Sequence, residues 1–134
     1  MTVSLQTLSA QVTDPILQSR AGHAQYQAPI YDALLGFNHE SLYGGVGPGV
    51  AKEWGIDPDG NSWTFKLEEG LTFHDGEPLT AEDVKFSLER TMFHPETVTS
   101  DAKRLAKQLR QPPEEAIEAI DPLTLRIFTN GSKP

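Results

Sequence analysis

The sequence contains no cysteine among its 134 residues. That absence excludes disulfides, thiolate zinc sites and cysteine nucleophiles, and it is compatible with an oxidising compartment without demonstrating one. Basic residues are few, because 11 Lys and Arg stand against 19 Asp and Glu and give a formal net charge of −8. Nucleic-acid recognition needs a basic patch, so we expect no nucleic-acid partner. One basic cluster lies on a short amphipathic segment and is better explained as a solvated helix face than as a phosphate site: Lys103, Arg104, Lys107 and Arg110.

Long apolar runs are also missing. No stretch is apolar enough over a sufficient length to span a bilayer. The first five residues, Met-Thr-Val-Ser-Leu, lack the charged start and the apolar core of a secretory signal. We therefore expect no signal peptide in this chain, and either a cytoplasmic protein or one whose signal has been removed.

The first third of the chain has weak periodicity. Residues 3–8 alternate as a short strand does, and Asp14-Pro15 predicts a turn, because the residue before proline avoids helical geometry. Residues 19–35 are predicted to be helical, with a kink at Pro29 and an end at Gly36. The glycine-rich residues 44–49 lack the Lys-Ser/Thr ending of a phosphate loop, so a structural turn is favoured.

The clearest strand-turn-strand signal surrounds residues 57–61, where Asp, Pro, Gly and Asn form dense turn chemistry. Alternation continues from residue 63 to 68, breaks at Glu69-Gly70, and resumes at 71–73 before a second turn at Asp75-Gly76. We expect one set of apolar side chains from this region to face the core: Trp54, Trp63, Phe65, Leu67 and Phe73.

A capped helix follows. Thr80 is a good N-cap, and Asp83 can reach back to it as in a capping box. The predicted buried stripe consists of Ala81, Val84, Leu88 and Met92, with Phe86 off it. A second helix is expected from Ser100, with these residues inward: Ala102, Leu105, Ala106 and Leu109. Residues 116–120 and 123–128 form a predicted hairpin, so the irregular mixture of strands and helices indicates an α+β domain.

Candidate metal and catalytic residues are weak. Asp57 and Asp59 resemble the start of a calcium loop, but the glycine falls fourth and the twelfth residue, Glu68, faces out of a strand. His74 and Asp75 are sequence neighbours, whose side chains face opposite ways on a strand. The other histidines lack the spacing of a helical metal pair: His23, His39 and His94. We expect turn or surface roles, no metal, no cofactor and no enzyme activity.

Three stretches together resemble the signature of solute-binding protein family 5, which includes peptide-binding and nickel-binding proteins of ABC importers. They are PGVAKEW at 48–54, WTFKLEEG at 63–70 and FHDGEPLTAEDVKFSLER at 73–90. Asp14-Pro15 and residues 31–35 and 121–128 add weaker similarity. Val50 and Glu69 depart from the pattern in minor ways, whereas length departs strongly, because family members are much longer two-lobed clamshells.

The resemblance implies a fold and a site. The fold would be a mixed small sheet with flanking helices, part of the first lobe of a type II periplasmic-binding-protein clamshell. Residues 1–134 would be a single partial domain, the N-terminal part of that lobe, with the second lobe and the hinge absent. In peptide binders the segment after the Asp-Pro turn lines the cleft; carried over, it corresponds to Ser19, Arg20, Ala21 and Gly22. Residues 97–101 are a weaker candidate, because Asp101 stands where relatives place an aromatic ring.

The implied function is binding of a small solute or peptide for an ABC permease, in the periplasm or elsewhere outside the cytoplasm, with this chain forming one wall of the cleft. Three alternatives stay open. The chain could be the ligand-sensing domain of a transcription regulator, an enzyme that uses His74 or Asp75, or a truncated piece without independent binding that self-associates through unpaired sheet edges.

Overall fold

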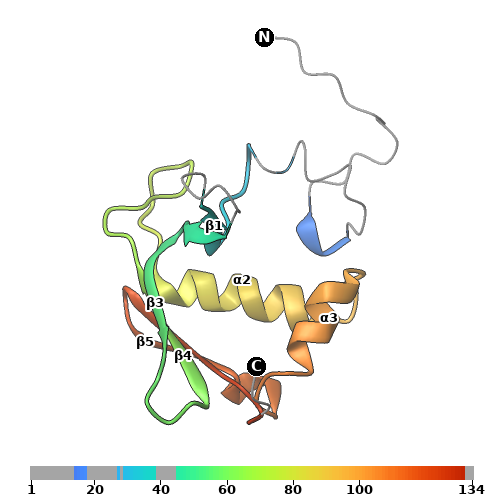
Figure 1. Ribbon diagram of the computed structural model, residues 1–134. Coiled ribbons are helices and arrows are strands. Elements are labelled where there is room, and N and C mark those ends of the chain that lie inside the picture. Colours follow the sequence, from blue (N-terminus) through green and yellow to red (C-terminus); the bar gives the residue numbers. More distant parts are fainter. Residues whose placement is uncertain (1–13, 18–26, 28, 39–44, 132–134) are drawn as a thin grey trace.

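The computed structural model describes residues 14–17, 27, 29–38 and 45–131. Its centre is a four-stranded antiparallel sheet in the order β3-β4-β6-β5, with α2 lying across one face (Figure 1). The strands are β3 (Ala51–Ile56), β4 (Ser62–Leu67), β5 (Ile117–Asp121) and β6 (Thr124–Phe128). The helices are α2 (Ala81–Phe93) and α3 (Ser100–Ala106). Two 3-10 turns are also present in the described chain, η1 (Pro15–Leu17) before β1 and η2 (Pro113–Glu115) after α3. A separate two-stranded ribbon pairs β1 (Leu35–Phe37) with β2 (Val46–Pro48).

The sheet has an apolar face toward α2 and a polar face toward solvent. Trp54 pairs with Phe65, and Phe65 pairs with Leu125, so the apolar residues of three strands line up on the helix side. Leu67 and Leu125 are almost completely buried there. On the opposite face Glu53 and Lys66 form an ion pair at 3.4 Å. The predicted alternation along β4 is confirmed, because a pleated strand sends successive side chains to opposite faces.

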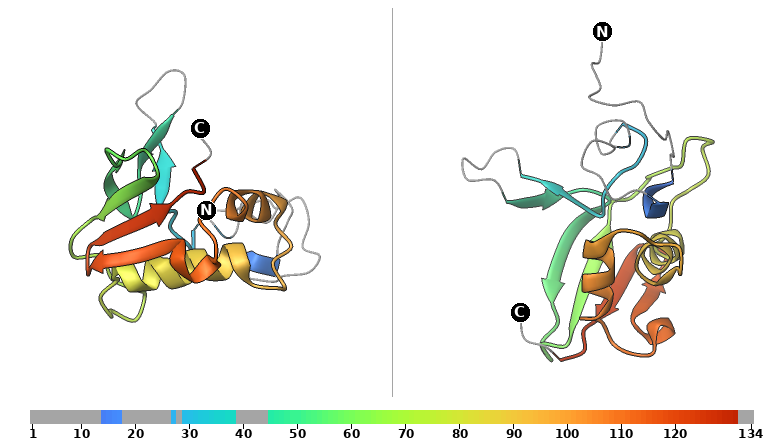
Figure 2. Two further views of the ribbon diagram at one scale, coloured as in Figure 1. Left: turned by 90° about the horizontal axis from the view of Figure 1, so that it is seen from below. Right: turned by 90° about the vertical axis from the view of Figure 1, so that its right-hand side faces the viewer.

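Helix α2 begins and packs as its sequence predicts. The backbone N–H of Thr80 donates to Asp83 Oδ2 at 2.9 Å, and the Thr80 hydroxyl donates to the same oxygen at 2.6 Å. Ala81 and Val84 are buried, while Leu88 and Met92 pack against the same core. The right-hand view of Figure 2 looks along α2, with α3 beside it. Among the described residues, no helix is long and apolar enough to cross a membrane.

The region before the sheet differs from its prediction. The helix predicted over 19–35 is confirmed at Gln27 but is wrong beyond Pro29, because residues 29–30 form a turn, residues 31–34 are not helical and Leu35 opens β1. Gly36 lies inside β1 opposite Gly47, and β2 (Val46–Pro48) occupies half of the predicted glycine-rich turn at 44–49. An added Cβ at Gly36 would lie 2.6 Å from Pro48 O. The glycines therefore permit close strand pairing, which outweighs the helical spacing of the apolar residues.

Two predicted core positions are also wrong. Phe73 is 43% exposed, and residues 71–73 form a single bridge between Thr72 and Pro78 in place of a strand. Leu105 is 49% exposed, because α3 ends at Ala106 and only Ala102 and Leu109 of its predicted inward side are buried. The α+β class and the hairpin of β5 and β6 are confirmed.

Candidate functional site

An ion pair joins the start of the described chain to the end of α2. Arg90 Nη1 donates to Asp14 Oδ1 at 2.9 Å, and Arg90 Nη2 donates to Asp14 Oδ2 at 2.5 Å. This is the planar two-bond geometry that favours arginine over lysine. The Arg90 guanidinium lowers the pKa of the Asp14 carboxyl, and the carboxylate raises the pKa of Arg90. The predicted turn at Asp14-Pro15 is confirmed as η1, in which Ile16 N–H donates to Asp14 Oδ1 at 3.2 Å.

The segment after α2 lies against the same turn. Val98 N–H donates to Ile16 O at 2.9 Å, and both Ile16 and Thr97 are almost fully buried. The Thr97 hydroxyl donates to Arg90 O at 3.4 Å. Arg90 in the last turns of α2 therefore contacts Thr97 through its carbonyl oxygen and Asp14 through its guanidinium. Residues 16 and 98, which are about eighty positions apart in the sequence, thus meet at the C-terminal end of α2.

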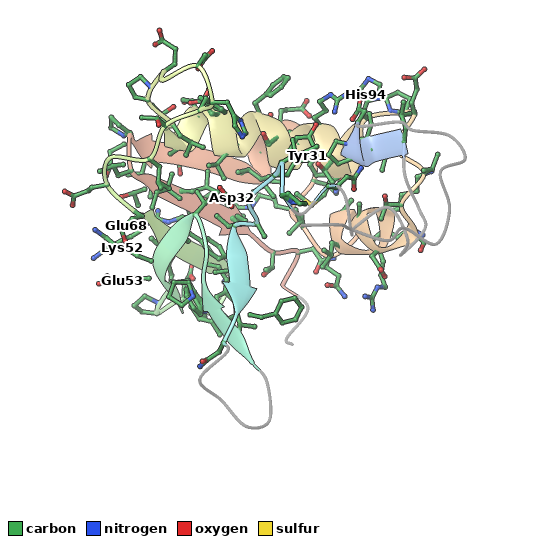
Figure 3. All side chains as sticks on the ribbon, turned by 90° about the horizontal axis from the view of Figure 1, so that it is seen from above. Tyr31, Asp32, Lys52, Glu53, Glu68 and His94 are labelled. Carbon is green, nitrogen blue, oxygen red and sulfur yellow. The ribbon has the colours of Figure 1, made fainter. Side chains whose placement is uncertain are left out.

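A hollow of about 630 Å³ runs along the face of α2 that the sheet does not cover. Its lining is mainly apolar: Pro15, Leu34, Val50, Leu79, Val84 and Leu88. Phe73 and Phe86 also line it and are 43% and 65% exposed. Figure 3 shows Tyr31 and Asp32, which belong to the same lining, on the segment that leads into β1, and His94 beside η1. Such an apolar hollow suits contact by shape with a solute or with more polypeptide.

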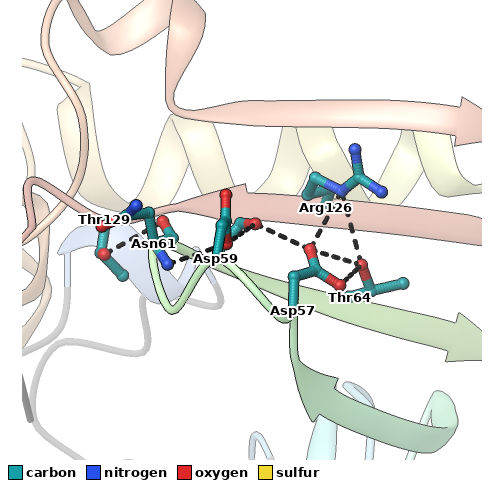
Figure 4. Close-up of polar contacts among 7 residues, drawn as sticks. Asp57, Asp59, Asn61, Thr64, Arg126 and Thr129 are labelled. Atoms are coloured by element: carbon teal, nitrogen blue, oxygen red, sulfur yellow. Dashed lines mark hydrogen bonds and ion pairs between the residues drawn. The ribbon is translucent and has the colours of Figure 1, made fainter.

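The turn between β3 and β4 is a polar network (Figure 4). Asp57 accepts hydrogen bonds from the hydroxyls of Ser62 at 2.7 Å and Thr64 at 2.9 Å, and Arg126 Nε lies 3.2 Å from it. The Ser62 hydrogen bond, followed by that of Thr64, lowers the pKa of Asp57. Asp59 Oδ1 accepts from Asn61 N–H at 2.9 Å. These side chains fasten the turn to β6, which is the structural reading of the Asp-x-Asp pattern.

The sequence-predicted catalytic pair lies on a turn. His74 is exposed, and Asp75 Oδ1 accepts the backbone N–H of Glu77 at 3.2 Å. The same turn is closed by Phe73 N–H donating to Glu77 O at 2.8 Å. In the described part of the chain, no three His, Asp or Glu side chains lie close enough together to hold a metal ion.

The site residues that the resemblance implies are only partly described. Ser19, Arg20, Ala21 and Gly22 lie outside the described residues, as do His23 and His39. Residues 97–101 are described: Thr97 is buried, and Asp101 is exposed and paired with Arg104 at 3.3 Å. The basic cluster has structural partners too, since the Arg110 guanidinium lies 4.0 Å above the Phe128 ring.

Sequence reasoning missed the pairing of Asp14 with Arg90. Asp14 stood out only as a turn residue, and Arg90 only as part of the family-like stretch. The two are 76 residues apart, so no local period links them. The only available signal was that each belongs to a separate stretch of the same family pattern.

Comparison with known proteins gives a consistent result. The model of the bacterial extracellular solute-binding proteins, family 5 Middle, matches residues 45–134. A probable peptide ABC transporter periplasmic-binding protein of Sinorhizobium fredii is 32% identical over 89 residues, which are 66% of this chain and 16% of that protein. The periplasmic murein peptide-binding protein MppA of Escherichia coli is 28% identical over 116 residues, covering 78% of this chain and 21% of MppA.

Solved structures superpose on the chain as well. A murein tripeptide-binding MppA in its unliganded open form gives a TM-score of 0.73 at 25% identity, over 89% of this chain and 24% of that one. A periplasmic oligopeptide-binding protein of Borrelia burgdorferi gives 0.72 at 26% identity, over 92% of this chain and 26% of that one. These neighbours have the type II periplasmic-binding-protein fold. The chain spans about a fifth of the length of the curated relatives it matches.

Proposed function

Because the chain belongs to the bacterial extracellular solute-binding proteins of family 5, we propose that it contributes one wall of a cleft that binds a peptide or a similar small solute. The bound solute would be passed to an ABC permease outside the cytoplasm. The residues would act by shape and hydrogen bonding, through closure of two lobes over the solute and without covalent chemistry. Division of the complete protein into two lobes and a hinge stays part of the proposal.

The observation that carries the proposal is the family match over residues 45–134, because those residues form the sheet and helix on which the candidate wall is built. Relatives named for murein peptides and oligopeptides favour a peptide as the solute. His74 and Asp75 lie on an exposed turn, and the Asp75 carboxylate accepts a backbone N–H from Glu77. This arrangement favours binding over catalysis, because a catalytic pair needs its side chains hydrogen-bonded to each other or to a third reactive group.

A chimera tests the proposal. The stretch of Escherichia coli MppA that aligns with residues 14–131 is replaced by this chain, and calorimetric titration measures the affinity for a murein tripeptide. We expect affinity within about tenfold of MppA, a difference of roughly 1.4 kcal/mol. Cooperative thermal unfolding establishes that the chimera is folded. A folded chimera without affinity for the peptide contradicts the proposal.

The isolated 134-residue chain is the matched control. One wall buries a solute from one side only, so we expect cooperative unfolding but no heat of peptide binding at micromolar concentrations. Micromolar binding by the isolated chain would contradict the one-wall interpretation. Self-association through the outer edges of β3 and β5 stays a prediction, which light scattering across concentrations checks.

A further inference from the structure

The ion pair between Asp14 and Arg90 connects η1 with the last turns of α2. It forms two parallel hydrogen bonds, of 2.9 Å and 2.5 Å, between groups that are about one third exposed, at 32% and 35%. A pair this exposed to water contributes little to global stability. A planar bidentate pair does, however, fix the relative orientation of the segments that carry it.

Docking of η1 has a different source. Ile16 is 1% exposed, so its burial holds the turn on the molecule whether or not Asp14 is charged. Burial of one side chain still allows the turn to rotate about the contact, because hydrophobic attraction has no direction. The ion pair and the hydrogen bond from Val98 N–H to Ile16 O fix the orientation of η1 relative to α2.

Arg90 is the residue common to both sides of this contact. Its guanidinium donates to Asp14, and its carbonyl oxygen accepts from His94 N–H at 3.3 Å and faces the Thr97 hydroxyl at 3.4 Å. The same residue therefore sets the position of η1 and of the start of residues 97–101, the described candidate segment for the cleft wall.

We propose that the Asp14–Arg90 pair is a positioning clamp that fixes η1 against residues 97–98 and thereby sets the geometry of the solute-binding wall. This inference rests on the proposed function. Asp14 and Arg90 both line the hollow along α2, and the role that we assign to Arg90 there is positioning, because two of its five N–H donors are held by Asp14.

The first test uses the 134-residue chain and needs no solute. Amide hydrogen exchange of Val98 is compared between the parent chain, Asp14→Asn and Arg90→Gln. Asn keeps an oxygen for Ile16 N–H but loses the charge-assisted pair. We expect exchange of Val98 to accelerate by about tenfold in both variants, while the amides of β4 and β6 stay unchanged, as local opening predicts. Arg104→Gln is the matched control, because it breaks the exposed pair with Asp101 and leaves the clamp intact.

The second test measures peptide affinity in the chimera with MppA. Each clamp variant should weaken affinity by about tenfold, within the range of couplings between groups that do not touch the same ligand. The double variant Asp14→Asn/Arg90→Gln should be no weaker than either single variant, since both remove one interaction. Arg104→Gln should bind as the parent does.

The outcomes separate the clamp from the proposed function. Additive losses in the double variant would show that Asp14 and Arg90 act independently and would overturn the clamp, as would unchanged Val98 exchange in both single variants. Unchanged affinity of the clamp variants in a chimera that binds peptide overturns the clamp alone. A folded parent chimera without affinity overturns the proposed function, and with it the role of the clamp in a cleft.

Discussion

The central sheet and the β1–β2 ribbon are held together by different forces. Leu67 and Leu125 are almost fully buried between the sheet and α2, so the sheet is stabilised by apolar burial. In the ribbon the paired residues Phe37 and Val46 are 81% and 57% exposed, and the strands meet through backbone hydrogen bonds and glycines. The sheet should therefore respond to loss of side-chain volume, and the ribbon to addition of it.

The largest expected effect concerns the sheet. Leu125 is completely buried on β6, between Phe65 and Ala119 of the neighbouring strands. Leu125→Ala should lower the free energy of unfolding by about 2–5 kcal/mol, because it removes apolar contacts and leaves a cavity. Denaturant unfolding measures this change. Ile120→Ala on β5, which removes a side chain that is 44% exposed, is the control and should change stability by less than about 1 kcal/mol. Equal losses would contradict a core at this position.

The next effect concerns Gly49, the residue that follows the ribbon. A Cβ at Gly49 would clash with the carbonyl oxygen of Ala33, which belongs to the backbone and cannot rotate away. Gly49→Ala should cost about 1–3 kcal/mol, as overpacking does, and should accelerate amide exchange at Val50 and Ala51, which donate to Ala33 O and Leu34 O.

Gly55→Ala is the control for the ribbon. An added Cβ at Gly55 meets no atom within 4 Å, and the residue lies in β3. This variant should unfold at nearly the parent's midpoint. If Gly49→Ala behaves like Gly55→Ala, the Cα of Gly49 does not lie as close to the carbonyl oxygen of Ala33 as the structure places it.

A smaller effect is expected at the N-terminus of α2. Thr80→Ala removes the hydroxyl that donates to Asp83 and should lower the free energy of unfolding by about 1 kcal/mol. Thr91→Ala makes the same chemical change inside the helix, where the Thr91 hydroxyl donates to Ser87 O. Alanine favours the helix interior, so this control should be neutral or stabilising in the same thermal melts. A loss at Thr91 as large as that at Thr80 would contradict the capping role.

The pH dependence follows from the same hydrogen bonds. The Thr80 hydroxyl lowers the pKa of Asp83, Arg90 lowers that of Asp14 and Ser62 lowers that of Asp57. Their pKa values in the folded chain lie below the ordinary 3.8, so between the two values the unfolded chain binds more protons than the folded one. The stabilisation that these three carboxylates contribute is therefore complete above about pH 4. It is lost as the pH falls through their lowered pKa values. Melts from pH 7 to pH 2 measure this, and Asp83→Asn should flatten part of the fall. A midpoint that rises on acidification would contradict these assignments.

Local patterns predicted the sheet and α2 because their signals act over a few residues. The cap at Thr80, the stripe of Ala81 and Val84 and the turn at 57–61 each depend on neighbours within one helical turn or one hairpin. The strands β5 and β6 lie within a residue or two of their predicted bounds. Family resemblance added the expected lobe, which the superposition on type II binding proteins supports.

The ribbon and the clamp were missed because both depend on partners distant in sequence. Residues 29–35 carry apolar residues at helical spacing, but Leu35 pairs with Pro48 across the ribbon. Arg90 and Asp14 are 76 residues apart, and they are brought together only by the tertiary fold. Alternation of apolar residues predicted that Phe73 lies in the core. The strand β4 ends at Leu67, however, and the Phe73 ring lines the hollow at the surface.

Amide exchange of Val98 in the unmodified 134-residue chain tests most directly whether the scaffold brings η1 and residues 97–98 together. The hydrogen bond from Val98 N–H to Ile16 O predicts protection well above the unfolded rate, together with a nuclear Overhauser contact between Ile16 and Val98. Val98 exchanging at the unfolded rate while the amides of β4 and β6 remain protected would contradict the account.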